Sequence, residues 1–192
     1  MKLYDFSMAP NARRVRMFAA EKGIELELVS VDLSKREQMN DEYRAVNPRL
    51  AVPTLVLDDG TTLTESVAIC RYLDELHPEP DLFGADPLDR ARVEMWHRRV
   101  ELEGMQAVAD GVRNSVEFFA GRAIPGPANF EQIPALAERG KARVDLFFDM
   151  LDARLADSEH IARDAFSIAD IAAVIGCDFA KVLKKRRSEE HT

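Results

Sequence analysis

The fold is decided by the stretch LAVPTLVLDDGTTLTES, residues 50–66. It contains a Val-Pro step, a short apolar run, a tight turn, a second short run and the start of a helical pattern. Asp59-Gly60 between the two runs predicts a β-hairpin, because glycine adopts a positive φ without steric cost. Pro53 has no N–H to give to a sheet, so it belongs at the first residue of a strand or at an edge. We therefore expect two short strands followed by a helix.

The same stretch contains two groups that suit a small acidic peptide. X-Pro is the only common place for a cis peptide bond, and a cis bond before Pro53 would leave the N–H and C=O of Val52 free to pair with an extended peptide. Thr64-Glu65-Ser66 opens a helix. The first N–H groups of a helix are unpaired and carry a partial positive charge, which suits a carboxylate. The backbone edge and the carboxylate pocket lie about one hairpin apart, so we expect a site for a small acidic peptide.

Composition and charge exclude several classes of function. The chain has 192 residues, 46% of them hydrophobic and 31% charged, and a formal net charge of −8. This acidic balance argues against a nucleic-acid surface, and no apolar run approaches the roughly 18 residues that span a bilayer. The two cysteines, Cys70 and Cys177, form no CxxC pair, so neither a disulfide framework nor a metal site is expected. The N-terminus does not resemble a signal peptide, and we expect a cytoplasmic protein.

The first part of the chain has the pattern of a small α/β domain. A strand is expected over residues 2–6, a helix over 10–22 and a second strand over 26–31, an order that implies a right-handed parallel crossover. In the helix, Arg14 and its arginine neighbours are expected to face solvent. A polar loop with a short helix leads to the hairpin, and a further helix is expected over 65–76. This β-α-β then β-β-α order is that of a thioredoxin-like domain, predicted for residues 1–80.

The rest of the chain has the pattern of an all-α domain. Residues 77–87 hold three prolines and a glycine and are expected to form a linker. Residues 88–192 are predicted to form a helical bundle, with helices over 88–119 and 133–156 and a third starting at Ser167. Ser167 and Asp170 have capping-box spacing, with Asp in place of the more usual Glu or Gln.

Val52-Pro53, Glu65-Ser66 and Ser167-x-x-Asp170, in this order, resemble the glutathione S-transferase family. The resemblance implies the two-domain fold of that family and glutathione as co-substrate. It implies that Val52 pairs through its backbone with the cysteinyl part of glutathione, with Pro53 fixing that backbone. Glu65 would receive the γ-glutamyl ammonium group and Ser66 the adjacent carboxylate, and Arg49 or Lys35 would meet the glycyl carboxylate. Ser66 and Glu65 also have structural interpretations, as a helix cap and a first-turn acid, and the two basic residues have one as solvated charges.

The resemblance covers nearly the whole chain and ends near its C-terminus. The family usually adds a closing helix after the position of residues 181–192, so the C-terminal domain is expected to be short. The basic run at residues 184–187 is expected to be solvated.

The position of the usual catalytic side chain departs from the family pattern. The reaction implied by the resemblance is attack of the glutathione thiolate on an electrophilic carbon, and a hydroxyl near the end of the first strand usually stabilises the thiolate. Here Ala9 precedes the loop proline and has nothing to donate, and Asp5 would oppose a thiolate. Asn11 is the leading remaining side-chain donor and Ser7 the second, beside the backbone N–H groups that begin the helix. The segment is most similar to a fungal and bacterial subgroup that lacks the usual catalytic serine, cysteine or tyrosine.

These features predict a glutathione transferase that conjugates the glutathione thiolate to a small electrophile, which is a detoxification activity. We expect a homodimer with no nucleic-acid or membrane partner. The alternative is a non-catalytic binding or dimerisation protein with the same fold, which Ala9 and the short C-terminus favour. A thiol-disulfide oxidoreductase is a third option, which would need a cysteine between Ser7 and Asn11.

Overall fold

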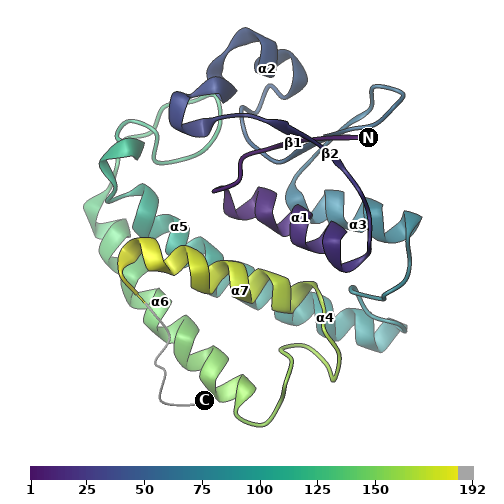
Figure 1. Ribbon diagram of the computed structural model, residues 1–192. Helices are drawn as coiled ribbons and strands as arrows, with labels where there is room; N and C mark the ends of the chain where they lie inside the picture. Colours follow the sequence, from purple (N-terminus) through teal and green to yellow (C-terminus); the bar gives the residue numbers. More distant parts are fainter. Residues whose placement is uncertain (186–192) are drawn as a thin grey trace. The chain divides into compact units, whose positions relative to one another are not determined.

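The computed structural model describes residues 1–185, which divide into two compact units (Figure 1). The first unit holds residues 1–80 together with the segment 125–129. The second unit holds residues 81–124 and the remainder of the described chain from Phe130. None of the helices in residues 1–185 combines the length and the apolar character needed to cross a membrane.

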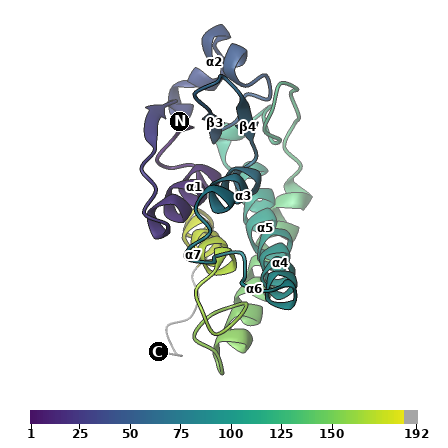
Figure 2. The same ribbon diagram turned by 90° about the vertical axis from the view of Figure 1, so that its right-hand side faces the viewer.

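The first unit is a mixed sheet with helices on both faces. In the order of the chain its main elements are β1 (Lys2–Asp5), α1 (Pro10–Glu21), β2 (Glu27–Ser30), α2 (Asp41–Val46), β3 (Thr54–Val56), β4 (Thr62–Thr64) and α3 (Ser66–Leu76). Two short 3₁₀ turns, Leu33–Lys35 and Glu37–Met39, precede α2. Helices α1 and α3 lie side by side on one face of the sheet and α2 lies on the other (Figures 1 and 2).

The sheet has the strand order β2-β1-β3-β4. Strands β1 and β2 are parallel, with Leu3 opposite Leu28, and the other pairs are antiparallel. Leu3 and Leu55 are fully buried, as is Phe18 on the apolar face of α1. The thioredoxin-like architecture predicted from the sequence is therefore confirmed, including the parallel crossover through α1.

Two local expectations for this unit are wrong. Arg14 is not available to solvent, because its side chain lies on the buried face of α1 and only 2% of the residue is exposed. Strand β2 is shorter than residues 26–31, and Leu28 is 53% exposed because β2 lies at the edge of the sheet.

The second unit is helical. Its main elements are α4 (Pro87–Arg99), a π-helical segment (Val100–Met105), α5 (Gln106–Arg113), α6 (Pro134–Leu155) and α7 (Ile168–Ala180), with 3₁₀ turns at Glu117–Phe119 and Lys181–Leu183. Helix α7 packs against α4 and the π-helical segment, and α5 packs against α6. Helices α5 and α6 approach closely where Gly140 faces Gly111, since a Cβ on Gly140 would lie 2.5 Å from the Gly111 nitrogen.

The helices of this unit match the sequence prediction in type and depart from it in detail. The expected helix over 88–119 contains a π-helical segment and ends at Arg113, because Asn114 bonds back to Asp110 and the chain then turns. The capping box of α7 is present, with the Ser167 N–H donating to Asp170 Oδ2 at 2.9 Å. Within the basic run, Lys185 pairs with Asp145 at 2.7 Å rather than facing solvent alone. Arg186 and Arg187 lie outside the described residues.

Candidate functional site

Two buried cations hold α1 and α3 side by side in the first unit. Near the start of α1, Arg14 Nη1 donates to Ser66 Oγ at 3.1 Å, and Ser66 is the first residue of α3. At the other end, Lys22 Nζ lies 2.7 Å from Asp74 Oδ1 and donates to the His77 carbonyl at 2.7 Å. The helices therefore run in the same direction and begin at the same end of the sheet. Two sets of first-turn N–H groups are brought together in this way.

Helix α3 begins in an unusual backbone conformation. Glu65, its N-cap residue, has φ 67° and ψ 118° and makes no side-chain cap hydrogen bond. A positive φ is unfavourable for a residue with a side chain, and such conformations cluster at functional sites. Ser66 is 6% exposed, so its hydroxyl lies at an uncapped helix start, where a carboxylate would meet both the hydroxyl and free N–H groups.

The loop before β3 presents a free stretch of backbone. The Val52-Pro53 peptide bond is cis, and within residues 1–185 neither the N–H nor the C=O of Val52 has a hydrogen-bond partner. The neighbouring Ala51 carbonyl is held firmly, because Tyr43 Oη donates to it at 2.6 Å and Asn47 Nδ2 at 2.8 Å. A rigid loop thus carries one unpaired residue that can pair with an extended peptide.

The start of α1 offers backbone donors rather than a side-chain cap. Ala9 is the N-cap residue and makes no side-chain hydrogen bond, and Pro10 occupies the first turn. Ser7 and Asn11 are both exposed, and in residues 1–185 neither side chain bonds to Val52, Glu65 or Ser66. The first-turn N–H groups of α1 are therefore the donors whose positions the fold fixes.

Asp5, at the end of β1, pairs with an arginine of α1 and is not one of the donors of the candidate site. Its carboxyl is buried and lies 3.3 Å from Arg16 Nε. Burial raises its pKa from the ordinary value, and the Arg16 charge opposes that rise. The same arginine donates through Nη2 to the Ser7 carbonyl at 2.8 Å, which ties the loop between β1 and α1 to the helix.

The two candidate basic residues differ in their surroundings. Arg49 Nε lies 3.7 Å from Glu65 Oε1, and both side chains are more than 70% exposed. Lys35 instead pairs with Asp32 at 3.2 Å, one turn away in its own 3₁₀ segment. The structure thus brings Arg49, Glu65 and Ser66 together and leaves Lys35 with a partner of its own.

Comparison with known proteins places these features in a family. Residues 3–81 match the model of the glutathione S-transferase N-terminal domain. Glutathione S-transferase 2 of Saccharomyces cerevisiae is 32% identical over 199 residues, which cover 99% of this chain and 80% of that protein. The chain belongs to the glutathione S-transferase family. Glutathione is the co-substrate of this family.

Solved structures of the glutathione S-transferase family share the whole fold. A glutathione S-transferase of class Gtt2 from Vibrio parahaemolyticus is 39% identical, with a TM-score of 0.82 over all of this chain and 87% of that one. The β-etherase LigF of Sphingobium sp. strain SYK-6 is 26% identical, with a TM-score of 0.80 over 100% of this chain and 87% of that one. Membership of the family therefore does not fix the reaction.

Sequence reasoning missed the buried residues that support the candidate site. Arg14 lies four residues before Phe18, so helical spacing alone would have put it on the buried face. Tyr43, Asn47 and Thr54 form a buried polar group behind the Val52 loop, with Asn47 Nδ2 2.9 Å from Thr54 Oγ1. The Asn-Pro step at residues 47–48 signals a turn, but nothing local indicates that its amide reaches the next strand.

Proposed function

We propose that this chain binds glutathione on its first unit and conjugates the glutathione thiolate to a small electrophile. The observation that carries the proposal is the Ser66 hydroxyl, buried at an uncapped helix start and held by Arg14 at 3.1 Å. Ser66 and the first N–H groups of α3 would bind the γ-glutamyl carboxylate, and Glu65 the adjacent ammonium group. The unpaired backbone of Val52, fixed by Pro53, would pair with the cysteinyl residue.

The glycyl carboxylate is assigned to Arg49. Both basic side chains are exposed and ion-paired, but Arg49 pairs with Glu65, a residue of the proposed site, whereas Lys35 pairs with Asp32 in a separate turn. An exposed arginine retains five donors for a carboxylate, so it can bind the glycyl end while it remains near the other residues of the site.

The thiolate is proposed to lie against the start of α1. A cysteine thiol has a pKa near 8.5, and a shift of about 2 units requires ~2.7 kcal/mol of preferential thiolate stabilisation. The N–H groups of the first turn and the helix dipole supply stabilisation of this kind without a side-chain hydroxyl at Ala9. Asn11 is the leading side-chain contributor and Ser7 the second. The thiolate forms a bond to an electrophilic carbon, whose leaving group departs with the bonding electron pair.

The proposal extends to the subgroup and the assembly. We place the chain in the subgroup that lacks the usual catalytic serine, cysteine or tyrosine, because Ala9, which precedes the loop proline, has no side-chain donor. Leu88 in α4 and Leu102 in the π-helical segment are 60% and 52% exposed. These exposed apolar side chains support a homodimer, which sedimentation velocity would detect as a species of twice the chain mass.

The binding site is tested with Ser66→Ala, measured by titration calorimetry with glutathione. Loss of a charge-assisted hydrogen bond is worth roughly 1.5–3 kcal/mol, so affinity should fall about tenfold or more. Ser34→Ala, which removes an exposed hydroxyl from the same unit, is the matched control and should leave affinity unchanged. Equal affinities of the two variants would place the glutathione site elsewhere.

A specific observation also favours the non-catalytic alternative. Ala9 has no donor, and the side chains of Ser7 and Asn11 are exposed to solvent. Ultraviolet difference titration of bound glutathione separates the two functions. An active transferase should show a thiolate pKa well below that of free glutathione, and Asn11→Ala should raise it if that side chain contributes. Binding with an unshifted pKa would instead identify a glutathione-binding protein without this chemistry.

A further inference from the structure

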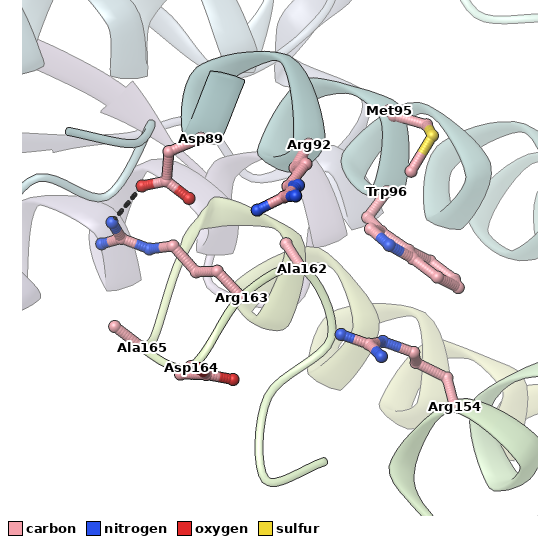
Figure 3. A pocket seen from close by; sticks show the side chains of 9 residues that line it. All are labelled: Asp89, Arg92, Met95, Trp96, Arg154, Ala162, Arg163, Asp164 and Ala165. Carbon is pink, nitrogen blue, oxygen red and sulfur yellow. Dashed lines mark hydrogen bonds and ion pairs between the residues drawn. The ribbon is translucent and has the colours of Figure 1, made fainter. Parts of the chain in front are cut away.

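The second unit contains a pocket that the glutathione site does not use. It has a volume of about 570 Å³, within the range typical of small-molecule sites. Three segments form its wall (Figure 3): α4, the C-terminal part of α6 and the loop 162–165. The lining residues are Asp89, Arg92, Met95, Trp96, Arg154, Ala162, Arg163, Asp164 and Ala165. We call it the Arg92 pocket.

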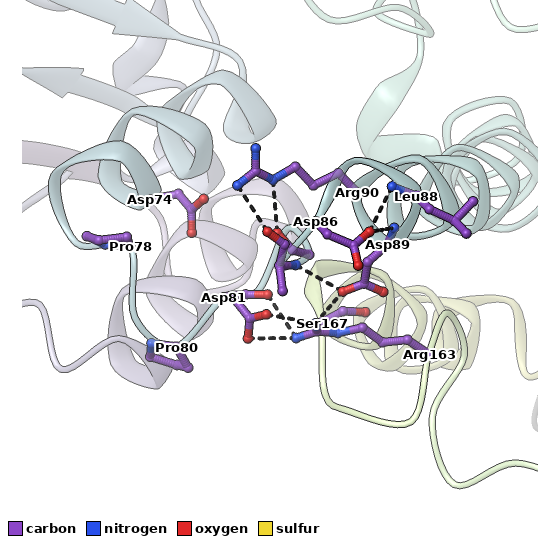
Figure 4. Close-up of polar contacts among 12 residues, drawn as sticks. Asp74, Pro78, Pro80, Asp81, Asp86, Leu88, Asp89, Arg90, Arg163 and Ser167 are labelled. Atoms are coloured by element: carbon purple, nitrogen blue, oxygen red, sulfur yellow. Dashed lines mark hydrogen bonds and ion pairs between the residues drawn. The ribbon is translucent and has the colours of Figure 1, made fainter.

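One end of the Arg92 pocket is neutralised by a structural ion cluster. Arg163 donates to both Asp81 carboxylate oxygens at 2.9 Å, and its Nη1 lies 2.5 Å from Asp89 Oδ2 (Figure 4). The hydrogen bonds that Arg163 donates to the carboxylates of Asp81 and Asp89 raise its pKa. Asp89 also accepts the Ala85 N–H at 3.0 Å. Arg163 and Asp89 therefore hold the wall in place and are not free for a ligand.

The pocket is also lined by two arginines that form no ion pair within residues 1–185. Within residues 1–185, neither Arg92 nor Arg154 forms an ion pair, although acidic residues outnumber basic ones 34 to 26 in the chain. Arg154 is positioned by its Nε, which donates to the Ile161 carbonyl at 2.6 Å, and by Trp96, whose ring centroid lies 5.2 Å from its guanidinium carbon. Its terminal nitrogens remain available. In Figure 3, Arg92 and Arg154 both reach toward the loop that carries Ala162.

We propose that the Arg92 pocket binds a small aromatic carboxylate. Arg92 and Arg154 would bind the carboxylate, because guanidinium groups match its planar geometry. The ring would lie against the apolar side chains of Met95 and Ala162, beside Trp96, whose own ring already contacts the guanidinium groups of Arg154 and Arg99. The exposed Asp164 carboxylate belongs to the same lining and repels a second negative charge, so a monoanion is favoured over a phosphate dianion.

The chain provides its own probe of this pocket, since Trp96 is its single tryptophan. Full-length protein labelled with fluorotryptophan should give one fluorine NMR resonance, which is titrated with benzoate, with the uncharged benzyl alcohol and with inorganic phosphate. We expect benzoate to shift the resonance saturably and the other two compounds to leave it unshifted at the same concentrations. Saturating glutathione should not alter the benzoate affinity, because the proposed glutathione site belongs to the other unit.

Two matched variants test the arginine contribution. Arg92→Gln should weaken benzoate binding about tenfold or more, the factor expected for loss of a charge-assisted hydrogen bond. Arg139→Gln removes the same charge from an exposed position on α6 and should leave binding unchanged. Arg92 is exposed and makes no hydrogen bond or ion pair within residues 1–185, so the Arg92→Gln protein should retain its wild-type melting temperature and remain a valid test.

Four results would overturn the proposal: no saturable shift with benzoate, an equal shift with benzyl alcohol, an equal shift with phosphate, or an unchanged affinity in Arg92→Gln. Competition between glutathione and benzoate would overturn the separation of the two sites. None of these results bears on Ser66→Ala, so failure here and failure of the proposed glutathione site are distinguishable.

Discussion

Replacement of Lys22 by methionine should destabilise the first unit more than any single surface change. The Lys22 side chain is fully buried. Its ammonium group lies 2.7 Å from Asp74 Oδ1 and donates to the carbonyls of His77 at 2.7 Å, Pro78 at 3.3 Å and Pro80 at 2.6 Å. Methionine fills a similar volume but has no donor. The variant therefore leaves one carboxylate and three carbonyl groups without their cation.

The size of the effect follows from which groups remain buried. Asp74 is only 17% exposed, so its charge cannot be fully hydrated without movement of the chain. Removal of one partner of a buried ion pair costs about 3–5 kcal/mol, most of it from the uncompensated charge. Lys2→Met is the matched control, because Lys2 lies 3.5 Å from Glu27 and both side chains are more than 50% exposed. An exposed pair of this kind contributes about 0–1 kcal/mol.

Urea unfolding followed by far-ultraviolet circular dichroism measures both variants. With a slope of about 2 kcal/mol per molar urea, Lys22→Met should lower the midpoint of the first unit by about 2 M and Lys2→Met by less than about 0.5 M. Trp96 fluorescence, which reports on the second unit, should be recorded alongside because the two units need not unfold together. Equal midpoints for the two lysine variants would refute the assignment of Lys22 as a buried structural cation.

Four further outcomes are expected. Glu65→Gly should raise the free energy of unfolding by about 1 kcal/mol in urea titrations, because relief of ~1–3 kcal/mol of backbone strain exceeds the entropy cost of glycine. Glu65→Gln keeps the strain and should leave the free energy of unfolding unchanged. Gly140→Ala should destabilise the second unit by about 1–3 kcal/mol in the same assay, since the new Cβ meets backbone atoms of α5. Burial raises the pKa of Cys70 to about 12, so at neutral pH a disulfide reagent should modify it only as fast as the protein unfolds. Burial also raises the pKa of Asp5, so the protonated carboxyl stabilises the folded state at acid pH and this stabilisation is lost as the carboxyl ionises. Asparagine resembles the protonated carboxyl, so Asp5→Asn should stabilise the protein at pH 7 but not below about pH 3.

Elements with strong local signals could be predicted from the sequence. The hairpin around Asp59-Gly60 is determined by one turn residue that accepts φ 86°. The start of α7 is determined by Ser167 and Asp170, which bond to each other across three residues. Helix α1 begins at Pro10, where the missing N–H has no cost. In each case the atoms that decide the conformation are close together in the chain.

Features that depend on distant partners could not be predicted in this way. Arg14 is buried because Ser66, fifty-two residues away, accepts its hydrogen bond. The Arg92 pocket exists because α4, the end of α6 and the loop after it meet in space. The end of α5 at Arg113 is fixed partly by Asn114, whose side chain also accepts the Ile133 N–H at 2.9 Å. No periodicity or capping pattern contains this information, since it resides in contacts between separate segments.

Under the proposed function, the arrangement of α1 and α3 would allow a transferase site to work with alanine at position 9. A side-chain hydroxyl is one way to place a donor near a thiolate, but the first N–H groups of a helix are donors that every sequence provides. Their usefulness depends on where the helix begins, and here Pro10 fixes that start while Arg14 and Lys22 fix α1 against α3 at its two ends. Under the proposed function, the thiolate donor is thus positioned by the buried cations Arg14 and Lys22 and does not depend on the side chain at position 9. Under the proposed function, position 9 can vary while the contacts of Arg14 and Lys22 cannot.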